Sequence, residues 1–175
     1  VWLITFATFF TRSGSRQTIL PFVAESRLDM STGTLGLLLT AMTIVQGSLI
    51  IPASRCADTY GRRPVILVGA MVASIGPLLF ATADAYPLFL VAAFVVSSGE
   101  AIGQPAAAAY VADIAPATSR GLAMGVNRTM GDLGFVLGPL VLGFIADSSG
   151  FSSAFLANAL LLAAGGAVFF RFARQ

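Results

Sequence analysis

Residues 86–111 read YPLFLVAAFVVSSGEAIGQPAAAAYV, and this stretch decides the class of fold. Its only charged residue is Glu100. At a rise of about 1.5 Å per residue, a helix of this length spans the hydrocarbon core of a bilayer, which is about 30 Å thick. The stretch is therefore expected to cross a membrane, with Glu100 in the central zone.

Five more apolar blocks reach the length of a membrane-spanning helix. The predicted helices cover residues 1–24, 32–53, 64–83, 86–111, 121–146 and 151–172, and Ser31 is a good N-cap for the second. The composition agrees, since 57% of residues are hydrophobic and 10% are charged, against about 25% charged in soluble domains. We predict an all-α membrane protein in which residues 1–175 form one six-helix bundle surrounded by lipid bilayer.

Several classes of function conflict with this composition. The chain has no His and one Cys, Cys56, which excludes an internal disulfide, a His-dependent zinc site and a Ser-His or Cys-His nucleophile pair. A net charge of +2 without a basic run gives no reason to expect nucleic-acid binding. We therefore expect no catalytic residue, no metal site and no nucleic-acid partner.

Arginines concentrate at one end of the predicted bundle. That end carries six arginines, whereas the opposite end has only Arg27. The six are Arg55, Arg62, Arg63, Arg120, Arg171 and Arg174. The positive-inside rule then places this end, with both ends of the chain, in the cytoplasm of an integral plasma (inner) membrane protein.

Polar side chains from four helices are expected at one depth. Counting along each helix puts Arg16, Gln46, Glu100 and Asp132 in the central zone of the bilayer. Ionisable groups at that depth normally face a bundle interior or a wet cavity. We therefore expect the first, second, fourth and fifth helices to line a cavity and the third and sixth, which bring no such group, to face lipid. The candidate substrate and proton cavity comprises Arg12, Arg16, Gln17, Gln46, Glu100, Gln104, Arg128 and Asp132.

The charges in this cavity allow more than one pairing. Arg128 and Asp132 are four residues apart and can neutralise each other on one helix face. Arg12 and Arg16 repel each other and need an anion, either Glu100 or a substrate. We favour Glu100 as a protonation site over a permanent Arg16–Glu100 ion pair, with Asp132 as the second candidate for the proton.

Two glycine-containing segments have specific spacing. In the fifth helix, Gly131, Gly134 and Gly138 share a face that lets another backbone approach, and Pro139 bends or stiffens the helix. From spacing alone, ordinary helix packing explains these residues as well as a functional seam does. The segment 57–64, ADTYGRRP, contains a turn at Gly61, and taken alone it can be a positive anchor.

Together these segments resemble the major facilitator superfamily. The loop is similar to the motif G-x-x-x-D-[RK]-x-G-[RK]-[RK], matched at Asp58, Gly61, Arg62 and Arg63, with Ser54 and Thr59 as departures. The fifth helix is similar to the antiporter motif G-x8-G-x3-G-P-x2-G-G, matched at Gly125, Gly134, Gly138, Pro139 and Gly143, with Leu142 in place of one glycine. The resemblance covers essentially the whole chain.

The resemblance implies the N-terminal half of a twelve-helix transporter, built as a three-plus-three inverted repeat. It implies that Asp58 and Arg62 belong to a cytoplasmic gate and that Asp113 is the acid that pairs with the loop arginine. The antiporter motif is typical of proton-coupled drug exporters. Val95 stands where many such exporters carry an intramembrane arginine, a charge that Arg16 or Arg128 can supply.

The leading prediction is a secondary active transporter that exports a small amphipathic compound by alternating access, with H⁺ as coupling ion and no other cofactor. Its expected partners are the substrate and a missing C-terminal six-helix half, although a dimer of six-helix units is an alternative. A symporter or importer of a small organic anion is the second reading, because three cavity arginines face two acids. An intramembrane enzyme using Ser97 lacks a His or Lys base, and a passive scaffold does not explain charges converging from four helices.

Overall fold

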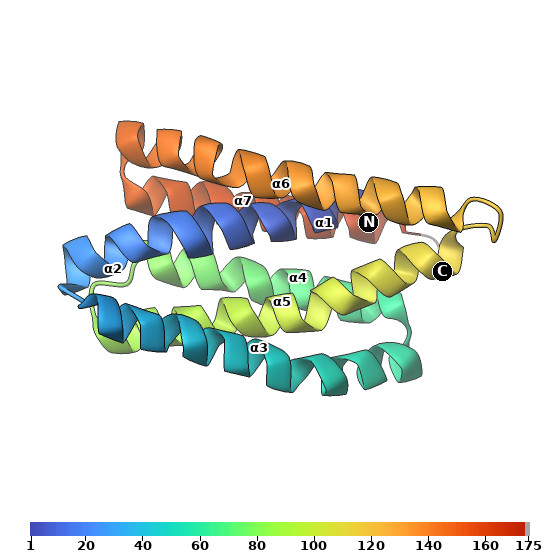
Figure 1. Cartoon of the computed structure of the whole chain (residues 1–175), viewed down its shortest axis with the longest axis horizontal. Helices are drawn as coiled ribbons and strands as arrows, with labels where there is room; N and C mark the ends of the chain where they lie inside the picture. Colours follow the sequence, from blue (N-terminus) through green and yellow to red (C-terminus); the bar gives the residue numbers. More distant parts are fainter. Residues whose placement is uncertain (174–175) are drawn as a thin grey trace.

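A computed structural model describes residues 1–173, so Arg174 lies outside the described residues. The first crossing is one unbroken helix made of α1 (Trp2–Phe10), the π-helical segment η1 (Thr11–Ile19) and α2 (Leu20–Leu28). The other helices are α3 (Thr32–Tyr60), α4 (Arg62–Ala81), α5 (Tyr86–Ile114), α6 (Arg120–Ser149) and α7 (Phe151–Phe172). Figure 1 shows them side by side in one bundle, with both termini at the same end.

The prediction of an all-α bundle is confirmed. Each of the five helices from α3 to α7 is long and apolar enough to span a bilayer. The sixth crossing is the continuous helix from Trp2 to Leu28, which is roughly 40 Å long at 1.5 Å per residue. Within residues 1–173 the chain forms no strand.

The helices extend further than the apolar blocks, because a helix need not end where the lipid ends. The second block was expected to end at residue 53, but α3 continues to Tyr60, and Gly61 alone separates it from α4. Gly61 has a φ of +93°, which favours glycine, so the predicted turn is confirmed. The Ser31 hydroxyl accepts a hydrogen bond from the Thr34 backbone N–H at 3.3 Å, which confirms the predicted N-cap.

Small residues let α4 and α5 pack backbone to backbone. A Cβ added at Gly69 of α4 would lie 2.5 Å from the backbone of Gly103 in α5. Aromatic rings fill the core at the end of the bundle opposite the termini, where Phe80 lies 4.8 Å from Phe89 and 5.2 Å from Phe155 between ring centroids. This packing fixes α5, the helix that carries Glu100, against α4, which in turn packs against α7.

Within this bundle, the predicted third and sixth helices, α4 and α7, are covered more by their neighbours than α3 and α6 are. In the most apolar stretch of α4, 44% of residues are buried, and the same holds for α7, whereas the shares for α3 and α6 are 17% and 22%. The reason is that α4 lies between α5 and α7 and exposes one stripe, which includes Val68, Met71 and Ile75. The broadest uncovered apolar faces belong to α3 and α6, as at Leu37 and Phe144.

Candidate functional site

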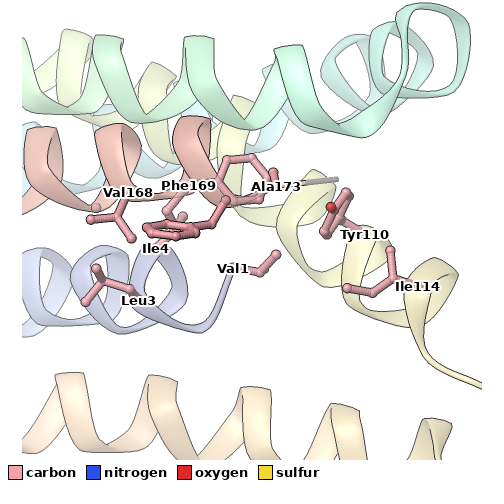
Figure 2. Close-up of a pocket in the computed structure, with 10 residues that line it drawn as sticks. Val1, Leu3, Ile4, Tyr110, Ile114, Val168, Phe169 and Ala173 are labelled. Atoms are coloured by element: carbon pink, nitrogen blue, oxygen red, sulfur yellow. The ribbon is translucent and has the colours of Figure 1, made fainter. Parts of the chain in front are cut away.

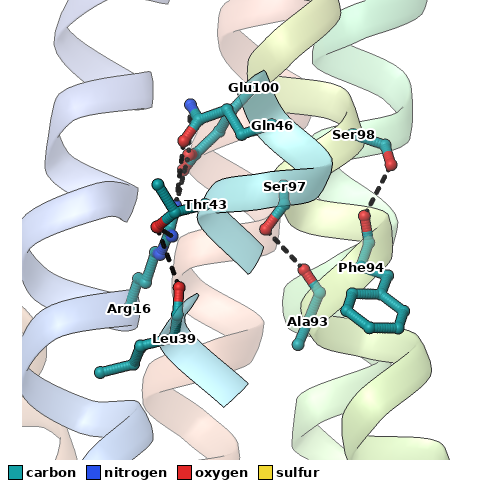
Figure 3. A network of polar contacts seen from close by, with 9 residues as sticks. All are labelled: Arg16, Leu39, Thr43, Gln46, Ala93, Phe94, Ser97, Ser98 and Glu100. Atoms are coloured by element: carbon teal, nitrogen blue, oxygen red, sulfur yellow. Dashed lines mark hydrogen bonds and ion pairs between the residues drawn. The ribbon is translucent and has the colours of Figure 1, made fainter. Parts of the chain in front are cut away.

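Three of the predicted cavity residues meet inside the bundle. Arg16 of η1, Gln46 of α3 and Glu100 of α5 are buried, and Glu100 is only 2% exposed. Arg16 Nη1 lies 3.3 Å from Gln46 Oε1 and 3.5 Å from Glu100 Oε2, while Nη2 donates to the Thr43 hydroxyl at 3.1 Å. Gln46 Nε2 donates to Glu100 Oε2 at 3.4 Å. Figure 3 shows this network bridging three helices that are distant in sequence.

The two oxygens of the Glu100 carboxylate have different surroundings. Oε2 receives both the Arg16 and the Gln46 contacts, whereas Oε1 is buried without a hydrogen-bond partner among the described residues. A buried charge is costly unless it is paired and its remaining lone pairs are satisfied. Glu100 is therefore half satisfied, because only one of its two buried oxygens has a partner among the described residues.

The helix that carries Arg16 is wound more loosely than an α-helix at this point. The Leu20 backbone N–H donates to the Ser15 carbonyl, and the Thr18 hydroxyl donates to the Ser13 carbonyl at 3.0 Å, both five residues apart. Short π-helical segments are rare and occur frequently at functional sites. The widened turn therefore coincides with the centre of the candidate site.

Asp132 does not join this network, contrary to the expected convergence of four helices. It pairs instead with Arg128, whose Nε lies 3.1 Å from Asp132 Oδ1, and both side chains are more than half exposed. The cause is the rotation of α6, which turns Gly131, Gly134 and Gly138 towards the first helix. One residue along an α-helix rotates by about 100°, so the residue after Gly131 points away from that contact. The ion pair between Arg128 and Asp132, which their four-residue spacing allowed, is therefore the one observed.

A second polar cavity lies one to two helical turns closer to the chain termini. It has a volume of about 200 Å³ and lies between α1, α5 and α6. Its polar lining consists of Thr5, Thr8, Gln104, Asn127 and Arg128. The Thr5 hydroxyl donates to Asn127 Oδ1 at 2.8 Å, so α1 and α6 are joined across it.

The other predicted cavity residues occupy different surroundings. Gln104 and Arg128 line the second cavity and do not touch the Arg16 network. Arg12 is half-buried, and Gln17 is exposed. The polar residues therefore form two groups, one around Glu100 and one around Gln104, where a single group was expected.

Sequence reasoning missed Asn158 in α7, and the statement that the sixth helix brings no polar group was wrong. Asn158 is fully buried, and its Oδ1 accepts a hydrogen bond from the Thr11 hydroxyl at 2.9 Å. Its Nδ2 has no partner among the described residues. The signal was present, because Asn158 is the one amide in an otherwise apolar run, and an amide at that depth in lipid needs a partner.

The gate-motif residues gather at the end of the bundle where the chain termini lie. Arg62 forms ion pairs with Asp58 of α3 and with Asp113 of α5, the latter at 3.3 Å, so the pairing implied by the family resemblance is present. Arg63 donates to the Phe170 carbonyl at 2.6 Å, and its guanidinium lies 5.6 Å from the Phe170 ring centroid. These contacts tie the start of α4 to α3, α5 and α7.

The glycines of the antiporter-like motif fall into two classes. A Cβ added at Gly138 would lie 2.6 Å from the Phe10 carbonyl oxygen, and one at Gly134 would overlap the Phe6 carbonyl. An added Cβ at Gly125 or Gly143 would meet no described atom within 4 Å. Packing between α6 and the first helix therefore explains Gly134 and Gly138, whereas Gly125 and Gly143 face outward.

A larger cavity lies apart from both polar groups. Its volume is about 410 Å³, and its lining comes from α1, α5 and α7, as at Ile4, Tyr110 and Phe169 in Figure 2. None of the predicted substrate or proton residues lines it. Size alone therefore does not identify the functional site here.

Ser97 and Ser98, the serines next to Glu100 in α5, form hydrogen bonds within their own helix. Their hydroxyls donate to the carbonyls of Ala93 and Phe94, one turn earlier in α5, at 2.8 and 2.7 Å (Figure 3). Neither contacts a base. The polar groups of the site are arranged to hold charge within a membrane-spanning bundle.

Known proteins with similar sequences carry drug-resistance names. The chain is 33% identical over 137 residues to Multidrug resistance protein 2 of Bacillus subtilis, covering 78% of this chain and 34% of that protein. It is 32% identical over 142 residues to the Lincomycin resistance protein of Streptomyces lincolnensis, covering 79% of this chain and 28% of that protein. This chain thus spans about a third of the length of such relatives.

Structural comparison agrees on the fold. The human organic anion transporter MFSD10 (TETRAN) superposes with a TM-score of 0.87 at 20% identity, covering 95% of this chain and 39% of that one. A six-helix bundle that matches somewhat less than half of a transporter fits the predicted half-transporter fold. The family model described as Major Facilitator Superfamily matches residues 1–175. The chain therefore belongs to the Major Facilitator Superfamily.

Proposed function

We propose that the chain is half of a proton-coupled transporter that exports small amphipathic compounds by alternating access. The names of its relatives, multidrug and lincomycin resistance proteins, support efflux. The buried network around Glu100 is the observation that carries the proposal. It gives the bundle an acid whose charge changes would be felt by three helices at once.

Glu100 is the proposed proton carrier. The groups that contact it are Arg16 on the first helix and Gln46 on α3. When Glu100 is ionised, it holds Arg16 and links η1 to α5. When Glu100 takes a proton, its ion pair with Arg16 is lost. Arg16 then keeps its contacts with Thr43 and Gln46 of α3, so the strength of the contact between the first helix and α5 changes. Proton binding is thereby coupled to the arrangement of the bundle.

The proposed partner is a second six-helix half, which would cover the broad apolar faces of α3 and α6. Rocking of two such halves around a site at mid-membrane is the usual mode of these folds. We place the end that carries Arg62 and Arg63 in the cytoplasm, on the strength of its arginines. Arg62, Asp58 and Asp113 would then form part of the cytoplasmic gate.

The test uses the full-length protein in inverted membrane vesicles, with N-phenyl-1-naphthylamine as a neutral amphipathic probe. An imposed pH gradient, acid inside, should drive uptake of the probe, and Glu100→Gln should abolish this dependence because an amide cannot carry the proton. Glu25→Gln is the matched control, since Glu25 is exposed near the end of α2. Uptake by Glu100→Gln that still follows the gradient would remove Glu100 from the coupling role.

A further inference from the structure

The intramembrane charges of this half do not balance. Arg16 pairs with Glu100, and Arg128 pairs with Asp132. Arg12 makes no hydrogen bond or ion pair with any residue that the structure describes, although it is half-buried within the first crossing. A charged side chain in this setting is costly and marks a pathway or a ligand site. The unpaired guanidinium therefore calls for an anion.

The position of Arg12 follows from the helix that carries it. Thr5, Thr8, Arg12 and Arg16 are spaced three or four residues apart and so lie along one face. Thr5 and Thr8 line the second cavity, and Arg16 reaches Glu100. Arg12 lies between these levels, one turn beyond Thr8, and is not itself among the residues that line the cavity.

On α5, polar residues also lie at both levels, with Glu100 at the level of Arg16 and Gln104 at the level of the second cavity. Gln104 lies one turn from Glu100 and lines the second cavity, and its amide makes no hydrogen bond with a described residue. Arg128, which also lines the cavity, uses Nε for Asp132, and its two terminal nitrogens make no hydrogen bond with a described residue. Phe9 and Met124 supply apolar lining beside these groups.

The available polar groups are mostly donors. Arg12 and Arg128 offer guanidinium N–H groups, and Gln104 offers an amide N–H, whereas the Thr8 hydroxyl already donates to the Ile4 carbonyl. Paired N–H donors at a guanidinium match the geometry of a carboxylate or sulfonate. The apolar lining suits the hydrocarbon part of the same molecule.

We propose that Arg12, with the cavity between α1, α5 and α6, binds the anionic group of the transported compound. This inference rests on the proposed transport function and narrows its substrate class to amphipathic organic anions and zwitterions. The acid group would lie on the termini side of the Glu100 network, with the rings of the compound against Phe9 and Met124. An acid from the second half of the protein would be the competing partner for Arg12.

A matched pair of ligands tests the proposal. 1-Anilinonaphthalene-8-sulfonate has the ring system of N-phenyl-1-naphthylamine and adds one sulfonate. Equilibrium dialysis of both against the purified full-length protein in neutral detergent gives two Kd values for each variant. Arg12→Gln should weaken binding of the sulfonate by roughly 10- to 100-fold, the loss expected for one charge-assisted hydrogen-bonding group, and leave the neutral probe unchanged. Arg12→Lys should recover part of the loss.

The control and the outcomes separate the two proposals. Arg27→Gln removes one arginine at the opposite end, where it donates to Ser152 at 2.9 Å, and should alter neither Kd. Unchanged sulfonate binding in Arg12→Gln would overturn the anion site alone. An equal loss for both probes would also overturn it, since that points to misfolding or to a general packing role. Failure of the wild-type protein to bind either probe would overturn the proposed function as well.

Discussion

Replacing Gly138 with Ala should separate α6 from the first helix. The added Cβ would lie 2.6 Å from the Phe10 carbonyl oxygen and 2.9 Å from the Gly14 backbone nitrogen. Ordinary van der Waals contact begins at 3.4 Å, so the two backbones must move apart by about 0.8 Å, the difference between 3.4 and 2.6 Å. Backbone atoms on both sides leave no flexible side chain to move aside.

The energetic cost can be bounded from two opposing effects. Overpacking of this kind costs about 1–3 kcal/mol. Alanine gains about 1 kcal/mol over glycine as a helix former, which offsets part of that cost. Because Gly134 packs against the same helix, the separation also loosens its contact with Phe6. We expect a net destabilisation of up to about 2 kcal/mol from these terms.

Thermal unfolding of the purified chain in mild detergent measures the effect. Gly143→Ala is the matched control, because it changes a glycine of the same motif and helix but meets no described atom within 4 Å. The Tm of Gly138→Ala should fall by several degrees, at about 2–4 °C per kcal/mol for a chain of this size, while that of Gly143→Ala should stay level or rise. Equal Tm values for the two variants would refute the packing argument for the motif.

Two further predictions concern contacts between helices. Thr11→Val and Asn158→Leu each break the hydrogen bond between η1 and α7. A double-mutant cycle on Tm or denaturant stability should give a coupling energy of about 0.6 kcal/mol, which is typical of such bonds in membrane bundles. A coupling energy of zero would mean that the bond does not contribute to stability. Asp113→Asn removes one of the two carboxylates that Arg62 contacts, and because the Asp113 side chain is 58% exposed the stability loss should stay below about 1 kcal/mol and vanish in high salt. A large, salt-independent loss would show that the Arg62 pairs do more than surface ion pairs do.

Most of the fold was predictable because lipid imposes one simple requirement, a run of apolar residues about as long as the bilayer is thick. The depth of Arg16, Gln46 and Glu100 along their helices was predictable for a related reason, because the rise per residue in a helix is nearly constant. Their meeting in one network follows from their common depth and from the cost of burying each alone. These inferences needed only distances along the chain.

Rotation about the helix axis was not predictable in the same way. Asp132 has the expected depth, but its direction is set by which face of α6 packs against the first helix, and that depends on the backbone contacts of Gly134 and Gly138. How much of α4 its neighbours cover was likewise not predictable, because an apolar helix suits lipid and a bundle interior equally well. The π-helical winding of η1 depends on hydrogen bonds between residues five apart, for which the segment has no sequence signature that we recognise.

Arg62 and Arg63 are adjacent in the chain, and their side chains diverge to different helices. Through them the start of α4 contacts both the last turn of α5 and the last turn of α7. A displacement that draws Asp113 outward must strain the contact at the Phe170 carbonyl or break it. The two arginines thus link the last turns of α5 and α7 through the start of α4, and this link should loosen as salt screens the exposed Arg62–Asp113 pair.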